Sequence, residues 1–270
     1  MVKITFIRHG ESTDNIRDVW AGWKDATLTT HGVKQAEALA LSFATTSFTD
    51  IYTSDLKRAF MTAQAIHAAQ RPSTKLHTTK LLREQYFGAA EGTSYKHKRD
   101  KDLTLRQHFS RGIYPPVFSR HERFPGGESK DDVSERAREF MDTVILPLVQ
   151  QEAEGQVKSV HIAVVSHGLF IPELVVLLWK KHKNPVSTEF ELRQNLRGMR
   201  NTAWTRIEFG FDGDSAGDTV SRPCKLKFLH VNCHNHLDSL TRQKGGISRL
   251  AYDPAQKDIR SFFSKNKSSS

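Results

Sequence analysis

The sequence is poor in cysteine and has no long apolar stretch. Among its 270 residues, only Cys224 and Cys233 carry a thiol. Two thiols are too few for a disulfide framework, which excludes a small disulfide-rich secreted protein and fits a reducing compartment. The longest apolar stretch, residues 169–179, contains a proline and a glutamate and is shorter than the ~20 residues of a membrane-spanning helix. The first residues lack the layout of a secretory signal, so the cytoplasm is the expected compartment.

Acidic residues are outnumbered, and the imbalance is local. The formal net charge is +10, from 40 Lys and Arg against 30 Asp and Glu. Residues 94–123 hold eight basic and three acidic side chains, and residues 241–270 hold seven and two. The charge is not spread evenly, so we expect no direct binding of nucleic acid. The two segments favour an anionic ligand near the first and an exposed tail at the second, although both also suit a plain solvated surface.

Strand and helix patterns alternate along the chain. Runs of β-branched and apolar residues predict strands at 2–7, 50–53, 76–78, 160–165, 204–209 and 225–231. Helical periodicity predicts helices at 29–44, 56–69, 129–151 and 168–181. This alternation predicts an α/β fold, a three-layer α/β/α sandwich around a parallel or mixed sheet.

Residues 94–125 interrupt this alternation. They show no clean period, contain Pro115 and Pro116, and end at a Pro-Gly-Gly sequence. We therefore predict an inserted, partly helical lid whose basic side chains favour a substrate with a second anionic group. A solvated surface insert is the alternative.

Polar side chains follow three of the predicted strands. They stand in the segments Arg8-His9-Gly10, Ser54 to Arg58, and Ser166-His167-Gly168. Because functional sites of α/β folds lie at the carboxyl ends of the strands, we expect these side chains to share one edge of the sheet. Two histidines and two arginines would then meet there.

This combination of side chains suits a phosphate ester. Guanidinium groups match phosphate oxygens in a bidentate fashion, and the cations can stabilise the charge of the transition state without a metal. A histidine can attack phosphorus when its other ring nitrogen is held by a carbonyl. A carboxyl of raised pKa can then serve as both acid and base, and Glu84, after the third strand, is the candidate.

The motifs that carry these residues resemble a known family. They are Arg8-His9-Gly10-Glu11-Ser12 with Asn15, Ala21-Gly22-Trp23, Ser54-Asp55-Leu56-Lys57-Arg58, Leu82-Arg83-Glu84 with Glu91-Gly92, Gly126-Gly127-Glu128-Ser129, Ser166-His167-Gly168, and Asn201-Thr202-Ala203. Together they resemble the phosphoglycerate mutase-like branch of the histidine phosphatase superfamily over residues 2 to about 209. The continuation after the first motif disfavours the acid phosphatase and phytase branch.

The resemblance implies a phosphoglycerate mutase-like fold and a role for each residue. His9 is expected to form a phosphohistidine, and Glu84 to donate and accept the proton. Arg8, Arg58 and His167 are expected to form the phosphate pocket. Further contacts with phosphate or substrate are expected from Ser12, Asn15, Gly22 and Gly168. The resemblance implies no metal and no other cofactor.

Departures from the glycolytic mutases favour a phosphatase. Those enzymes resemble this chain but place an arginine, a tyrosine and a threonine where Gln85, Phe87 and Ala21 stand here. Losing an arginine–carboxylate contact costs about 1.5–3 kcal/mol of binding, enough to change substrate preference. We expect hydrolysis of a small phosphorylated metabolite, a sugar phosphate or bisphosphate, as in the fructose-2,6-bisphosphatase-like group. A mutase, a protein phosphatase and a partner-binding protein on an inactive enzyme fold remain alternatives.

The C-terminal segment lies outside this resemblance. We predict a catalytic domain at 1–233 and a basic, partly disordered tail at 234–270. Gln256, Ile259, Phe262 and Phe263 resemble the short peptide that binds the eukaryotic DNA sliding clamp, and with the basic tail they leave a nuclear location open. The two phenylalanines could equally dock on the protein itself. The Cys233-His234-Asn235-His236 sequence lacks a second ligand pair at zinc spacing, so we expect no metal there.

Overall fold

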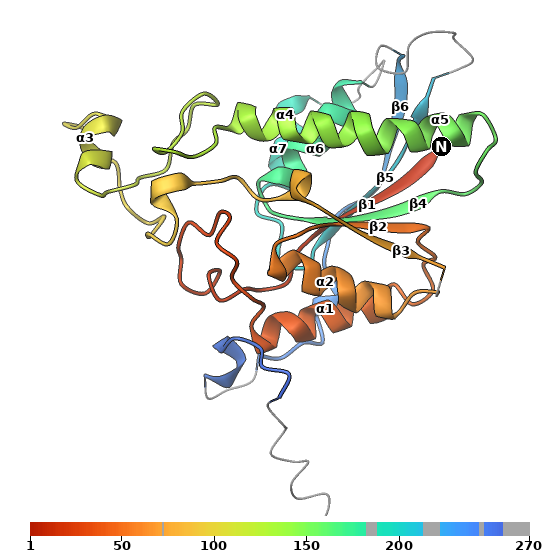
Figure 1. Ribbon diagram of the computed structural model, residues 1–270, viewed down its shortest axis with the longest axis horizontal. Coiled ribbons are helices and arrows are strands. Elements are labelled where there is room, and N and C mark those ends of the chain that lie inside the picture. Colours follow the sequence, from red (N-terminus) through yellow and green to blue (C-terminus); the bar gives the residue numbers. More distant parts are fainter. Residues whose placement is uncertain (72, 182–187, 213–221, 243–245, 256–270) are drawn as a thin grey trace, which may run out of the picture.

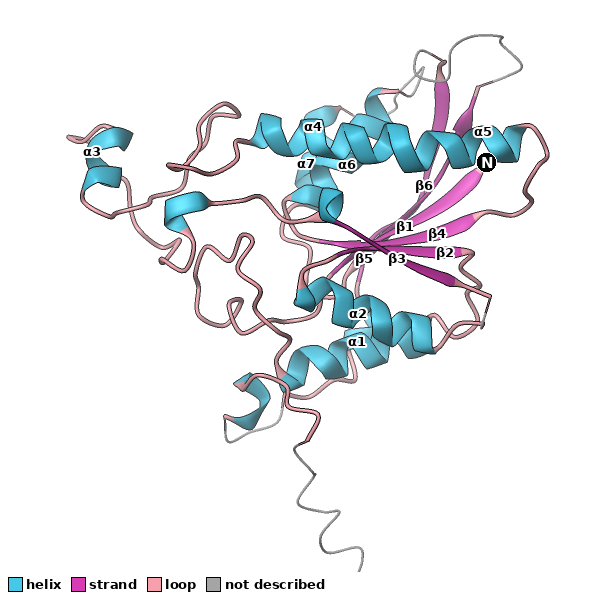
Figure 2. Ribbon diagram, in the orientation of Figure 1, coloured by secondary structure: helices cyan, strands magenta, loops and turns pink. Residues whose placement is uncertain are grey.

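A six-stranded mixed sheet forms the centre of the molecule (Figure 2). The computed structural model describes residues 1–71, 73–181, 188–212, 222–242 and 246–255. The strand order is β3-β2-β4-β1-β5-β6. The strands span Val2–Arg8 (β1), Asp50–Ser54 (β2), Lys75–Thr79 (β3), His161–Ser166 (β4), Trp204–Phe211 (β5) and Cys224–Cys233 (β6). β3, β2, β4 and β1 run parallel, and β5 is antiparallel to both of its neighbours.

The helices cover both faces of the sheet, so the predicted three-layer architecture is confirmed (Figure 1). One face carries α1 and α2, and the other carries α4, α5 and α6. Their bounds are Thr30–Ser42 (α1), Lys57–Ala68 (α2), Lys130–Phe140 (α4), Leu146–Ala153 (α5) and Phe170–Lys180 (α6). A separate apolar core fills each interface, and β4, which lies between β2 and β1, is buried along its whole length.

The predicted helix over 129–151 is divided in two. Met141–Ile145 forms a π-helical turn between α4 and α5, and Pro147 lies in the first turn of α5. Proline has no backbone N–H to give to the carbonyl four residues earlier, and a wider turn just before it accommodates that missing hydrogen bond.

A short helix absent from our predictions, α7 (Glu189–Leu196), packs against α6. Its sequence is mostly polar, which hides the apolar period. The Thr188–Glu191 capping box at its start is a signal that could have located it.

The insert is partly helical, as predicted, with α3 at Leu105–Ser110 (Figure 1). Its Phe109 and Phe124 join Trp20, Phe87 and Ala90 of the catalytic domain in a third apolar cluster. The insert is therefore anchored by an aromatic core, while its action as a lid stays a prediction.

The described part of the segment after Cys233 runs back over α1, and its residues 249–255 are exposed on the surface. Thr30 N donates to Leu250 O at 3.1 Å, and Tyr252 N donates to Leu28 O at 2.9 Å. Arg242 forms an ion pair with Glu11. Backbone hydrogen bonds of this kind cannot be predicted from composition, so the contact of this segment with α1 did not follow from its basic charge. The boundary at 233 remains a prediction.

Two further expectations concern membranes and metals. Within the described ranges, no helix is both long and apolar enough to cross a bilayer. Cys233 Sγ lies 3.8 Å from Val231 O, and His236 Nε2 lies 2.9 Å from Thr202 Oγ1. These two candidate metal ligands therefore have protein partners of their own.

Candidate active site

The carboxyl ends of β1 and β4 place two histidines side by side. Arg8 is in register with Ser166, so the next residues, His9 and His167, are neighbours. Their ring centroids are 5.0 Å apart. Arg58 stands in the first turn of α2, which follows β2, the other neighbour of β4. The topology thus brings together the residues that the sequence placed at three strand ends.

His9 is buried and oriented by its own backbone. Its Nδ1 lies 2.7 Å from Gly10 O, which places the proton on Nδ1 and leaves the lone pair on Nε2. Burial, together with the charges of Arg58 and Arg8, lowers the pKa of His9 well below its ordinary value. The ring is therefore neutral and able to act as a nucleophile.

Three cationic or polar side chains around His9 hold unused hydrogen-bonding atoms. Within the described residues, Arg8 Nε, Arg58 Nε and both ring nitrogens of His167 are buried without a partner. Other nitrogens of the arginines are fixed: Arg58 donates to Gly22 O at 2.7 Å and to Lys24 O at 2.9 Å, and Arg8 donates to Met199 O. Because an unpaired buried polar group costs about 1–3 kcal/mol, this arrangement is best satisfied by an anionic ligand.

Glu84 lies beside this group with a raised pKa. Its Oε1 accepts from Gln85 N at 3.0 Å and its Oε2 from Leu169 N at 3.4 Å. Desolvation raises the pKa, and it outweighs the opposing effects of these two N–H groups and of Arg58 and Arg8. Glu84 as a whole residue is half-buried, and its carboxyl is desolvated by the surrounding protein.

The backbone that carries Glu84 is held by two side chains that sequence reasoning missed as site residues. Trp23 Nε1 donates to Glu84 O at 2.7 Å, and Arg136 Nη2 donates to the same oxygen at 3.2 Å. Arg136 also forms an ion pair with Glu128 at 2.9 Å. Trp23 lies in a family motif, but nothing in the sequence around Arg136 marks its role.

Ser12 and Asn15 contact each other at the edge of the site. Asn15 Oδ1 accepts from Ser12 N at 3.0 Å, from Ser12 Oγ at 3.2 Å and from Asn201 Nδ2 at 3.1 Å. Asn201 Nδ2 also donates to His9 O at 3.1 Å. The amide oxygen of Asn15 is thus fully used, which leaves its Nδ2 as the donor for a ligand. Asn201 was not predicted as a site residue, although it lies in one of the family motifs, and the structure shows that it belongs to this network.

The backbone and its surroundings require glycine at position 22 but not at position 168. Gly22 has φ +51°, and a Cβ there would lie 1.9 Å from Glu91 Oε1. Its carbonyl also accepts from Arg58. A Cβ at Gly168 would lie 3.5 Å from Arg8 Nε, an ordinary contact. Gly22 therefore shapes the arginine site, and Gly168 borders it.

The sequence of this chain matches the model of a known protein family. The model for the histidine phosphatase superfamily (branch 1) matches residues 4–216. This chain belongs to the histidine phosphatase superfamily. The family resemblance seen in its motifs is confirmed.

Curated relatives of this histidine phosphatase carry phosphatase and mutase names. A protein of Schizosaccharomyces pombe named as a probable phosphatase is 29% identical over 260 residues, 96% of this chain and 79% of its own length. Fructose-2,6-bisphosphatase TIGAR B of Danio rerio is 26% identical, over 88% of this chain and 96% of its own. A 2,3-bisphosphoglycerate-dependent phosphoglycerate mutase of Rhizobium etli is 31% identical, over 68% of this chain and 82% of its own.

Solved structures agree with the fold of this histidine phosphatase. Mycobacterial hydrolase 1 superposes with a TM-score of 0.67 at 22% identity, over 87% of this chain and all of its own. Mycobacterial glucosyl-3-phosphoglycerate phosphatase, in complex with VO3, gives 0.61 at 23% identity, over 85% and 98%. At these identities the structures support the α/β fold alone.

Proposed function

We propose that this chain is a metal-independent phosphatase that hydrolyses a small phosphorylated metabolite through a phosphohistidine at His9. One observation carries the proposal: the unpaired buried nitrogens of Arg8, Arg58 and His167 lie around a neutral, oriented histidine. Membership of the superfamily and the phosphatase names of relatives support assignment to the phosphoric monoester hydrolases.

In the first step, His9 Nε2 attacks phosphorus and the bond from phosphorus to the ester oxygen breaks. Arg8, Arg58 and His167 stabilise the charge on the phosphoryl oxygens, and Asn15 Nδ2 supplies a further donor. Glu84, whose raised pKa favours the protonated carboxyl, gives its proton to the departing oxygen. The products are the alcohol and phosphorylated His9.

In the second step, water attacks the phosphohistidine. Glu84, now a carboxylate, takes a proton from the water as the bond between phosphorus and Nε2 breaks. Inorganic phosphate leaves, and both residues return to their starting states.

Hydrolysis is favoured over phosphoryl return to a second substrate. Gln85, where the glycolytic mutases have an arginine, gives its amide Nε2 to Glu128 O at 2.7 Å and is buried. A neutral, occupied amide cannot replace an arginine that binds a carboxylate. The mutase names among relatives keep a mutase as the second candidate.

We expect the protein to release inorganic phosphate in the presence of a chelator. The test is a panel of sugar phosphates, glycerate phosphates, nucleotides and a phosphotyrosine peptide, with and without added Mg²⁺. The proposal predicts release from at least one small metabolite class at a rate that the metal does not change. No release from any member, or release only with metal, would contradict it.

The rate should depend on pH through His9 and Glu84. His9 must be neutral, and because its pKa is depressed, activity should persist well below pH 6.5. Glu84 must be protonated at the start, and because its pKa is raised, activity should survive above its ordinary value of 4.5 and fall only as the pH passes the raised value. The measurement is kcat/KM against pH, with Glu84→Gln as control. In Glu84→Gln the fall of kcat/KM at high pH should disappear, because the amide does not titrate. Any pH dependence caused by ionisation of the substrate should remain. An acidic limb beginning at pH 6.5 would contradict the assignment of His9.

The sliding-clamp peptide at Gln256, Ile259, Phe262 and Phe263 lies outside the described residues. Binding of a sliding clamp there stays a prediction, as does the compartment.

A further inference from the structure

A cavity opens directly beside the catalytic carboxyl. Its volume is about 400 Å³, within the range of small-molecule sites, and Gly168 and Leu169 form part of its wall. Gly168 borders Arg8, and Leu169 N contacts Glu84 Oε2. A phosphate ester bound at His9 therefore has its alcohol part next to this cavity.

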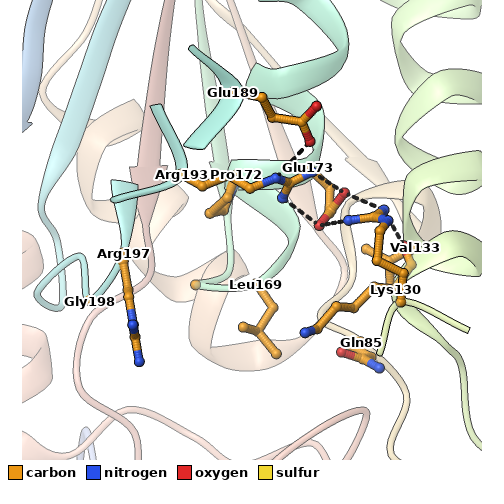
Figure 3. Close-up of a pocket in the computed structure, with 12 residues that line it drawn as sticks. Gln85, Lys130, Val133, Leu169, Pro172, Glu173, Glu189, Arg193, Arg197 and Gly198 are labelled. Atoms are coloured by element: carbon orange, nitrogen blue, oxygen red, sulfur yellow. Dashed lines mark hydrogen bonds and ion pairs between the residues drawn. The ribbon is translucent and has the colours of Figure 1, made fainter. Parts of the chain in front are cut away.

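The wall of the cavity combines apolar and cationic side chains (Figure 3). Val133, Leu169 and Pro172 supply apolar surface. Four cations line it with two carboxylates: Arg120, Lys130, Arg193 and Arg197 with Glu173 and Glu189. The cavity thus carries more positive than negative charge.

Two of the four cations are already paired. Arg120 contacts Glu173 and Asp131, each at 2.9 Å. Arg193 contacts the same Glu173 at 2.8 Å and Glu189 at 2.9 Å. Glu173 is almost fully buried, so this network has a fixed structural role in joining the insert to α6 and α7.

The other two cations have no carboxylate partner among the described residues. Lys130 Nζ donates only to Phe118 O, at 3.3 Å, and the side chain of Arg197 makes no hydrogen bond or ion pair there. Figure 3 shows them on opposite sides of Leu169. Lys130 is held in place because it follows Ser129, whose capping box with Asp132 starts α4.

We propose that this cavity binds the alcohol part of the substrate and that Lys130 and Arg197 bind a second anionic group on it. The inference rests on the proposed phosphatase function and narrows its substrate class. The substrate is a phosphate ester with an apolar face, such as a carbon chain or sugar ring, and a carboxylate or second phosphate. The basic insert contributes Arg120 to the wall of this cavity, but Arg120 is already paired with Glu173 and Asp131 and so has a structural role.

The test compares ligands that differ by one anionic group. The probes are 3-phosphoglycerate against glycerol 3-phosphate, and fructose 1,6-bisphosphate against fructose 6-phosphate. Each is measured as a competitive inhibitor of p-nitrophenyl phosphate hydrolysis, so none has to be a substrate. Lys130→Ala and Arg197→Ala should raise the inhibition constant of the doubly anionic ligand roughly tenfold to a hundredfold in at least one pair. The inhibition constant of the other ligand in that pair, which lacks the second anionic group, should stay within about twofold of its wild-type value.

A matched control comes from the insert. Lys101 is exposed, so Lys101→Ala should leave all four inhibition constants unchanged. An effect in only one pair identifies the second anion as carboxylate or phosphate. Equal losses for both members of each pair, or no loss in either pair, would overturn the subsite. If p-nitrophenyl phosphate hydrolysis still depends on His9 in that case, the phosphatase proposal stands without the subsite.

Discussion

Replacement of His9 by alanine should lower the rate of phosphate release by a factor on the order of 10³ to 10⁶, the scale seen when a catalytic nucleophile is removed. The reason is geometric. His9 combines a ring held through Nδ1, a lone pair on Nε2 and a depressed pKa. The ring centroid of His167 lies 5.0 Å from that of His9, but no carbonyl in the described part of the chain fixes its tautomer, so it cannot replace His9.

The measurement is steady-state phosphate release by purified His9→Ala beside the wild type. His77→Ala is a suitable control, because His77, on β3, is paired with Asp50 on β2 and lies outside the site. Both variants should unfold cooperatively near the wild-type temperature. Activity of His9→Ala within tenfold of the wild type would exclude a phosphohistidine at this position.

Glu84→Gln should have an effect that depends on the leaving group. For an alkyl phosphate the departing alkoxide needs a proton, so the rate should fall about 10²- to 10⁴-fold. For p-nitrophenyl phosphate the departing phenolate is stable without one, so phosphorylation of His9 should persist. Hydrolysis of the phosphohistidine lacks its base, and the intermediate should accumulate.

A rapid-mixing experiment makes this visible. Glu84→Gln should release one equivalent of p-nitrophenol per site in a burst and then turn over slowly. Glu135→Gln is the control, since Glu135 is highly exposed on α4. A Glu84→Gln enzyme that loses the same factor on alkyl and aryl phosphates, with no burst, would show that Glu84 does not act as the proton donor.

The core of the site could be predicted because its residues follow strands directly. Arg8 ends β1, His9 follows it and His167 directly follows β4, so short sequence segments identify them and the α/β rule places them together. Glu84 was predicted as the carboxyl that follows the third strand, and the structure places a 3₁₀ turn, Lys80–Leu82, between β3 and Glu84.

Other parts depend on contacts between residues far apart in the chain. Asn201 reaches Asn15 across 186 positions, and Arg242 reaches Glu11 across 231. Arg120 is paired with Glu173, whereas Lys130 has no carboxylate partner among the described residues, and a count of charges along the sequence cannot distinguish the two. The sequence alone therefore pointed to the insert as the anion-binding element, whereas the unpaired cations of the cavity lie on α4 and after α7.

The most direct test of the mechanism is to locate the phosphoryl group on the protein. Glu84→Gln is incubated with p-nitrophenyl phosphate, quenched at alkaline pH, where phosphohistidine survives, digested, and analysed by mass spectrometry. We predict a phosphoryl group on the peptide that contains His9 and on that residue alone. An unmodified His9 at the end of the burst, or a phosphoryl group on His167 instead, would contradict the proposed mechanism.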